Sequence, residues 1–122
     1  MSISRERCRP CGIDCLGVTP AEEAELLLFV AGWEIVNDGI ARQLSRSFPF
    51  DGWRPALEFA SRIGEQAEFE DHHPILTVAW GRVTVTWWAH VIRDLHRNDF
   101  VMACRTNHIF SDVRPRVQRS AD

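Results

Sequence analysis

The sequence predicts an α+β fold: a four-stranded antiparallel sheet with three helices packed on one face, in the order α-β-β-α-β-β-α. Strand-like segments come in pairs around Asp38-Gly39 and around Gly81, and such short glycine turns are typical of β-hairpins. Three other segments carry apolar residues at steps of three and four, which is typical of helices. A chain of 122 residues is long enough for one domain with its own core and short for two.

The first helix is predicted to begin at Thr19-Pro20-Ala21-Glu22. Threonine suits the N-cap, proline suits the first helical position, and Glu22 can complete a capping box. Gly32 is expected to end this helix. Residues 33–37 and 40–48 are then expected to form the first hairpin.

Asp51 is expected to cap a second helix that runs to about residue 67. Its apolar residues repeat at helical steps and should face the sheet: Trp53, Leu57, Ala60, Ile63 and Ala67. Residues 68–74 are predicted to form a loop, which leads into a second hairpin of residues 75–80 and 82–89.

Alternation along the last strand places Val83, Val85 and Trp87 on one face and Trp88 and His90 on the other. A third helix is predicted from about residue 97 to residue 110, with Cys104 as a small core residue.

The folded domain is predicted to span residues 19–113, after a flexible arm at 1–18 outside the core and before a frayed tail at 114–122. The arm contains Cys8, Cys11 and Cys15. Reduced surface thiols are the favoured interpretation, and a metal site and a disulfide or redox role stay open. No second C-x-x-C or sequence-adjacent histidine completes a tetrahedral zinc site.

The composition excludes several classes of function. Fourteen basic against seventeen acidic residues give a net charge of −3, so no strong field attracts nucleic acid or anionic lipid. Lysine and tyrosine are absent, which excludes a lysine Schiff base and a tyrosine acid. No apolar run approaches the roughly 20 residues that span a bilayer, and we expect a soluble, cytoplasmic protein.

The candidate chemistry lies in Glu68, His72, His73, Pro74 and His90. Adjacent histidines in an extended segment point in different directions, and the end of the last strand can bring His90 to the same edge. Histidine titrates near neutrality, so such a cluster can supply both a proton donor and a proton acceptor.

Neighbouring residues could support this cluster. Glu68 could orient a ring, and Trp80 and Trp88 could stack on a flat substrate. The plainer alternatives are surface histidines, core tryptophans, and an Asp99 that only complements a helix dipole. A zinc site of three histidines is disfavoured, because two adjacent ligands rarely reach one tetrahedral ion.

The spacing of these residues resembles the signature of the pterin-4a-carbinolamine dehydratases. That signature has an acidic residue, three spacers, His-His-Pro, an aromatic residue, a later histidine and an aspartate. The matching positions here are Glu68, His72-His73-Pro74, Trp80, His90 and Asp99. Residues 80–106 and the Cys8-x-x-Cys11 start are most similar to the bacterial branch associated with phenylalanine hydroxylase.

The resemblance implies this fold, a homodimer or homotetramer, and loss of water from 4a-hydroxytetrahydropterin without a metal or organic cofactor. It implies that His72 and His90 are the acid and base, while His73 mainly binds substrate. The implied substrate-binding residues are Asp71, His72, His73, Trp88, Ala89, His90 and Val91. Glu68, Trp80 and Asp99 would support them.

One departure from the family concerns the third helix. His96 stands where many relatives have a capping threonine, and Asn98 could take over that cap. Two other functions stay open: a non-catalytic coactivator or assembly protein on the same fold, and a zinc hydrolase.

Overall fold

The computed structural model describes residues 3–12 and 15–121 of the chain, and it has the predicted fold class. Its elements are η1 (Ile3–Arg5), α1 (Pro20–Leu27), β1 (Glu34–Asn37), β2 (Arg42–Pro49), α2 (Trp53–Glu70), β3 (Ile75–Ala79), β4 (Arg82–Trp87) and α3 (Arg97–Ala121).

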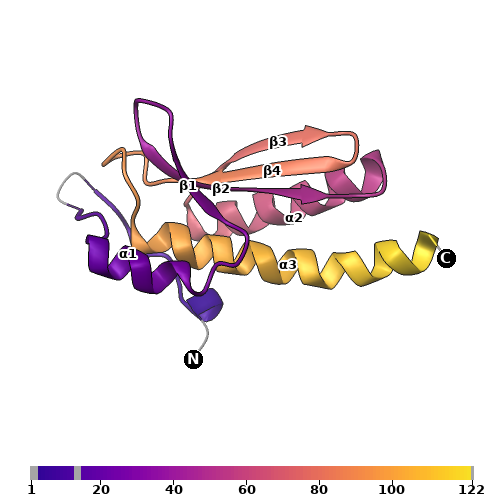
Figure 1. Ribbon diagram of the computed structural model, residues 1–122, viewed down its shortest axis with the longest axis horizontal. Coiled ribbons are helices and arrows are strands. Elements are labelled where there is room, and N and C mark those ends of the chain that lie inside the picture. Colours follow the sequence, from indigo (N-terminus) through magenta and orange to yellow (C-terminus); the bar gives the residue numbers. More distant parts are fainter. Residues whose placement is uncertain (1–2, 13–14, 122) are drawn as a thin grey trace.

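The four strands form one antiparallel sheet in the order β1-β2-β4-β3. Helices α2 and α3 lie along one face of this sheet, and α1 packs against α3 (Figure 1). In the second hairpin Ile75 pairs with Thr86, so the residues before β3 lie beside those after β4. This register brings the His72-His73 pair and His90 to the same end of the sheet.

The predicted alternation along β4 is present. Val83, Val85 and Trp87 are buried against the helices. On the other face the hydroxyl groups of Thr84 and Thr86 pair with serines of β2 at 2.8 and 3.0 Å. Apolar groups on one face and hydroxyl pairs on the other fix which face receives the helices, because a slip of one residue would reverse them.

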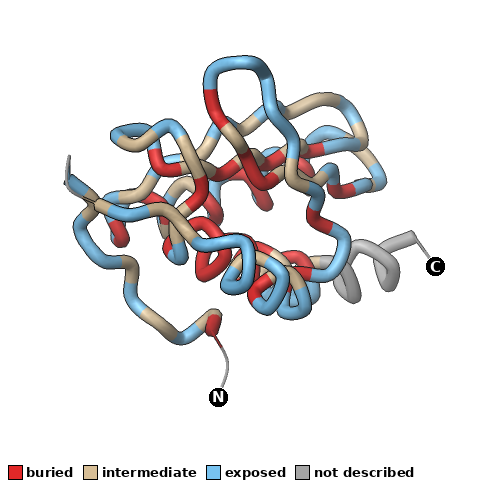
Figure 2. Tube along the Cα trace, turned by 60° about the vertical axis from the view of Figure 1, so that its left-hand side comes forward, coloured by how far each residue is buried: buried red, intermediate tan, exposed pale blue. Residues whose placement is uncertain are grey.

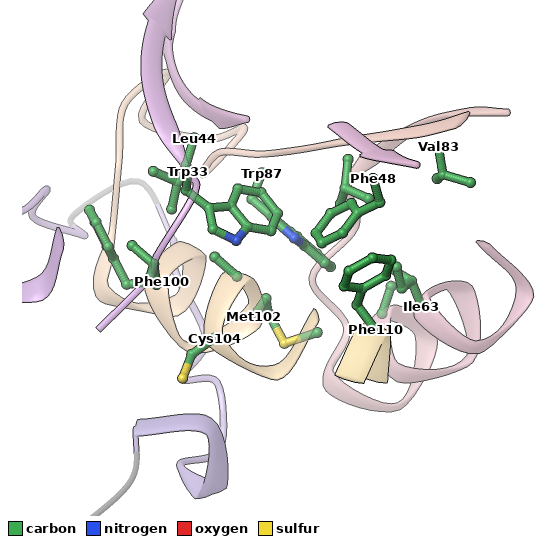
Figure 3. Close-up of a cluster of buried hydrophobic side chains, with 14 of the residues drawn as sticks. Trp33, Leu44, Phe48, Ile63, Val83, Trp87, Phe100, Met102, Cys104 and Phe110 are labelled. Atoms are coloured by element: carbon green, nitrogen blue, oxygen red, sulfur yellow. The ribbon is translucent and has the colours of Figure 1, made fainter. Parts of the chain in front are cut away.

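The core lies between the sheet and the two long helices, where the buried positions gather (Figure 2). Aromatic rings fill much of it, and Phe48 and Phe110 are neighbours there (Figure 3). The ring centroid of Phe48 lies 4.9 Å from that of Phe110 and 5.0 Å from that of Phe59. Truncating a ring in such a cluster typically costs about 3–5 kcal/mol. The cluster therefore gives the strands and helices that carry the histidines a rigid base.

Several helix boundaries differ from the predictions. The capping box at Thr19 is present, but α1 ends at Leu27 and not at Gly32. The N-cap of α2 is Gly52, without a side-chain bond, so the predicted cap at Asp51 is wrong.

On the buried side of α2, Ala56 and Phe59 join the predicted Ala60, Ile63 and Ala67. Trp53 and Leu57 are instead about half exposed, at 49% and 45%.

The predicted ends of α2 and α3 were also too early. Helix α2 continues to Glu70, which takes the first residues of the predicted loop into the helix. Helix α3 continues past residue 110 to Ala121, so residues 114–121 extend this helix where we expected a frayed tail. In the described part of the chain, no helix is both long and apolar enough to cross a membrane.

The N-terminal arm was predicted to lie outside the core, and for its described residues this prediction is wrong. Ile3 is only 6% exposed and belongs to the core cluster, and η1 packs against α3 on the side away from the sheet (Figure 1). Arg105 of α3 donates to the backbone oxygens of Ser4 and Glu6, at 3.1 and 2.5 Å. The described part of the arm is thus a packed element of the domain.

Candidate active site

The end of α2 sets the direction of the two adjacent histidines. Asp71 follows the helix in the left-handed conformation, with φ 52° and ψ 43°, and aspartate is among the residues that tolerate it. The backbone N–H of His72 donates to Ala67 O at 3.1 Å and closes the last turn. The chain then leaves the helix and enters β3 after Pro74, and the rings of His72 and His73 have different partners, Asp99 and Glu68.

His72 is held by a buried carboxylate. Its Nε2 lies 2.6 Å from Oδ1 of Asp99, whose side chain is fully buried, while the His72 side chain is 10% exposed. The ring also stacks on Trp87, with centroids 5.7 Å apart and planes 5° apart. A carboxylate accepts the hydrogen bond, so Nε2 carries a proton and Nδ1 of the neutral ring is left as an acceptor.

His90 is positioned from the other strand of the hairpin. Its Nε2 donates to the backbone oxygen of His73 at 3.2 Å. The ring stacks on Trp88, with centroids 4.2 Å apart and planes 4° apart. As in His72, an acceptor on Nε2 leaves Nδ1 of the neutral ring unprotonated.

His73 has a more exposed environment. Its Nε2 lies 2.7 Å from Oε1 of Glu68, and the two side chains are 51% and 81% exposed. Glu68 therefore faces His73 and not His72. A pair this exposed orients the ring only weakly.

One cavity of about 520 Å³ gathers most of the predicted substrate-binding residues. Its lining consists of Cys8, Arg9, Pro10, Cys11, Gly12, Glu70, Asp71, His72, His73, Ala89, His90, Val91 and Asn98. This volume is within the usual range of small-molecule sites.

Four predicted residues do not line this cavity directly: Glu68, Trp80, Trp88 and Asp99. Trp88 lies behind it, stacked on His90, and Asp99 lies beneath His72. Trp80 is 74% exposed at the β3–β4 turn, the opposite end of the hairpin from His90. The geometry therefore contradicts a stacking role for Trp80 in this cavity.

The arm supplies a wall of the cavity that sequence reasoning missed. Glu70 accepts from the backbone N–H of Cys8 and from the side chains of Arg7 and Arg105, at 2.8 to 2.9 Å. Burial raises the pKa of Glu70, but these three donors outweigh it and hold the pKa below its usual value. Asn98 completes the attachment by accepting from and donating to the backbone of Arg9, at 2.9 and 2.7 Å.

From the sequence, Asn98 could take over the cap of α3 from the threonine of relatives, but the structure has a different cap. His96 is itself the cap: its Nδ1 accepts from the backbone N–H of Asn98 at 3.0 Å. The backbone N–H of His96 donates to Oδ2 of Asp99 at 2.8 Å, which completes a capping box. Burial lowers the pKa of His96.

The cysteines also differ from the favoured prediction of reduced surface thiols. Cys11 and Cys15 form a disulfide, the alternative that stayed open. A loop this short contributes only about 2 kcal/mol in the chain-entropy model of disulfide stabilisation. Cys8 has no disulfide partner, and burial, together with the charge of Glu70, raises its pKa to about 12.

Metal-ligand spacing occurs at a different place from the three candidate histidines. In the described part of the chain, the one group with that spacing is Cys11, Cys15 and His96, whose donor atoms lie within 4.8 Å of one another. The three candidate histidines form no such group. The arrangement of His72 and His90 suits proton transfer, because both rings border one cavity and each has one nitrogen held by a protein acceptor.

Comparison with known proteins gives a family assignment. The sequence profile of the family described as pterin 4 alpha carbinolamine dehydratase matches residues 17–109. A Gloeobacter violaceus protein with the provisional name pterin-4-alpha-carbinolamine dehydratase 1 is 44% identical over 113 residues, which cover 93% of this chain and 97% of that protein. A Chlorobium luteolum protein with a similar provisional name is 42% identical over 91% of this chain and 97% of that protein.

Solved structures with the same fold include a Brucella melitensis protein titled transcriptional coactivator/pterin dehydratase. It is 34% identical, with a TM-score of 0.70 over 77% of this chain and 98% of that chain. A pterin dehydratase-like protein identified as a RuBisCO assembly factor in the alpha-carboxysome is 16% identical, with a TM-score of 0.56 over 67% and 93% of the two chains. The second likeness shows the fold alone.

Proposed function

The chain belongs to the pterin 4 alpha carbinolamine dehydratase family, and from this premise we propose that it removes water from 4a-hydroxytetrahydropterin to give quinonoid dihydropterin. The observation that carries the proposal is the pair His72 and His90. Each borders the same cavity and has one ring nitrogen held by a protein acceptor.

In the proposed step, one imidazole takes a proton from a ring nitrogen of the pterin, and the other gives a proton to the hydroxyl group that leaves as water. His72 is the better base, because buried Asp99 holds its Nε2–H and directs Nδ1 outward, as a carboxylate orients the histidine of a catalytic triad. Protonated His90 donates to the 4a-hydroxyl oxygen as the carbon–oxygen bond breaks. His90 is exposed and can regain its proton from water.

The other predicted residues bind the substrate. His73, Asp71, Ala89 and Val91 line the cavity around the pair, and Trp88 backs the ring of His90. The pterin is the substrate, and the proposed reaction uses no metal or organic cofactor. As part of the same proposal, a cytoplasmic homodimer or homotetramer returns pterin to an aromatic amino acid hydroxylase.

The test is the decay of the carbinolamine, followed by stopped-flow absorbance. His72→Ala and His90→Ala should each slow decay by about 10²- to 10⁴-fold, limited below by the uncatalysed reaction. His108→Ala is the matched control, because His108 is an exposed histidine on α3 outside the cavity lining. Wild-type rates in both cavity variants would refute the acid–base assignment.

The same assay separates the enzyme from its alternative. The Brucella relative is titled both coactivator and dehydratase, so a binding role on this fold is a real competitor. A folded wild-type protein that does not accelerate carbinolamine decay would favour the binding role. The presence of both histidines in one cavity favours the enzyme.

A further inference from the structure

The Cys11–Cys15 pair takes no part in the proposed dehydration, yet it lies at the same cavity. Cys11 lines the cavity together with His72, His73 and His90, whereas its disulfide partner Cys15 is not among the lining residues. The disulfide closes a loop with a sequence separation of only four, so it constrains few conformations of the unfolded chain. Its position at the cavity is thus better explained by chemistry than by stabilisation.

His96 is the polar neighbour of this pair. A ring nitrogen of His96 and the two sulfurs lie within 4.8 Å of one another. Because Nδ1 accepts the N–H of Asn98, the neutral ring carries its proton on Nε2. Coordination of a metal through Nε2 would require that proton to move to Nδ1, against the N–H of Asn98. An imidazole within 4.8 Å of both sulfurs suits instead a thiol that reacts as its thiolate.

The third thiol at the cavity is in a different state. Cys8 also lines the cavity, but burial and the charge of Glu70 raise its pKa to about 12, so it stays protonated. Thiolate, and not thiol, is the nucleophile in sulfur chemistry. The reactive pair is therefore Cys11 and Cys15, and Cys8 is its matched control.

We propose that the reduced Cys11–Cys15 pair transfers two electrons and two protons to quinonoid dihydropterin and returns it to tetrahydropterin. This inference rests on the proposed function, because that product would form beside Cys11. The pair ends as the observed disulfide. Turnover then needs an external dithiol, which reduces the disulfide and becomes oxidised itself.

The step balances in atoms and electrons. The Cys11 thiolate adds to the imine carbon 4a of the quinonoid ring, and the adjacent ring nitrogen takes a proton. Cys15 Sγ then attacks Cys11 Sγ, the sulfur–sulfur bond forms, and the carbon–sulfur bond breaks. Its electron pair stays with the pterin, which takes the second proton. The cavity-lining position of Cys11 assigns it the attack and leaves Cys15 as the resolving thiol.

The experiment supplies quinonoid dihydropterin made by chemical oxidation, so it does not depend on the dehydration step. Protein reduced with a dithiol and freed from it is mixed rapidly with this compound without oxygen. Tetrahydropterin is measured by chromatography, and thiols are measured by alkylation and mass spectrometry. We expect about one tetrahydropterin per chain, with alkylation lost at Cys11 and Cys15 and kept at Cys8.

Variants and a peptide make the test specific. Cys11→Ser and Cys15→Ser should each abolish formation of tetrahydropterin with an internal disulfide, while Cys104→Ala, a change in the core outside the cavity lining, should retain it. The protein should also react at least about 10-fold faster than a peptide of residues 10–16, since the cavity holds the pterin beside the thiol. Full alkylation of Cys11 and Cys15 after mixing, or a rate equal to that of the peptide, would overturn the inference.

Two assays on the same sample separate the two proposals. If wild-type protein accelerates carbinolamine decay but Cys11 and Cys15 stay reduced, this inference fails and the dehydratase stands. If the pair is oxidised by supplied quinonoid dihydropterin without any acceleration of carbinolamine decay, the dehydratase proposal fails and the thiol chemistry stands.

Discussion

Asp99 links the start of the last helix to the histidine cavity. One oxygen of its carboxylate contacts Nε2 of His72 and the other accepts the backbone N–H of His96. The side chain is fully buried, so both partners are fixed by the same rigid group. From the sequence, Asp99 was either a carboxylate that complements the helix dipole or, by family resemblance, a supporting residue of the site. Its contact with His72 was not predicted, because that contact depends on how α3 docks.

Asp99→Asn should preserve the N-terminus of α3 but weaken His72 as the base. If the amide oxygen keeps the N–H of His96, the amide nitrogen faces His72 and favours a proton on Nδ1, the wrong tautomer for a base. We expect carbinolamine decay to slow by at least about 10-fold and its pH profile to shift. Asp112→Asn, an exposed change on the same helix, should leave both unchanged. An unaltered pH profile in Asp99→Asn would show that the carboxylate has only a structural role.

The proximity of His72, His73 and His90 was predictable from the sequence, whereas the contacts that attach the N-terminal arm beside them were not. Residues 72, 73 and 90 flank the two strands of one hairpin, so their proximity follows from a local pairing. The contacts of Arg7 with Glu70 and of Arg9 with Asn98 join residues 63 and 89 positions apart. No periodicity or turn signal in a single sequence encodes such distant pairs.

The negative charge of Glu70, at the end of helix α2, is compensated in part by the N-terminal arm. Glu70 is 8% exposed and accepts from Arg7, Arg105 and the backbone of Cys8. Its pKa is lowered from the ordinary value of 4.5. A lowered folded-state pKa means that the ionised group stabilises the fold above the unfolded pKa. That contribution is lost as the pH falls through the folded pKa.

Glu70→Gln should therefore destabilise the protein in a pH-dependent way. Near neutral pH we expect a loss of about 3 kcal/mol in the free energy of unfolding, because two arginines lose a buried anion. The difference from wild type should shrink as the pH falls below the ordinary glutamate value of 4.5 and through the lowered pKa of Glu70. Chemical denaturation at several pH values measures it, with the exposed Glu65→Gln on the same helix as control. A difference that stays constant with pH would contradict the role of the charge.

The N-cap of α3, His96, allows a second test. His96→Thr supplies a side-chain oxygen to the N–H of Asn98, so the free energy of unfolding should change by less than about 1 kcal/mol. Carbinolamine decay should be kept, because Asp99 still receives the backbone N–H of residue 96. The reaction of Cys11 with quinonoid dihydropterin should slow at least about 10-fold without the imidazole. Equal thiol rates would remove His96 from that chemistry.

For the whole molecule, the sequence was sufficient for the order of elements and insufficient for the arm. Turn residues, capping residues and periodicity are local signals, and they placed three helices and four strands correctly in order. The polar composition of residues 3–12 suggested a free segment. Its attachment uses Ile3 in the core and backbone groups that accept from Arg105, and neither has a local signature.

Removal of residues 1–7 tests whether the arm contributes to substrate binding or to catalysis. The histidines stand on α2 and the β3–β4 hairpin, whereas the opposite wall, Cys8 to Gly12, is anchored by Ile3, Glu6 and Arg7. We therefore expect KM for the carbinolamine to rise by about 10-fold and kcat to change by less than about 3-fold, since substrate contacts weaken while the acid and base stay in place. Steady-state kinetics measure both constants.

Phe59→Ala is the comparison for this truncation. It should lower the free energy of unfolding by about 3–5 kcal/mol, because it removes a ring of the aromatic core, without selectively raising KM. If the shortened chain instead has a lower kcat with KM unchanged, the arm positions the reacting groups and does more than form a wall of the cavity.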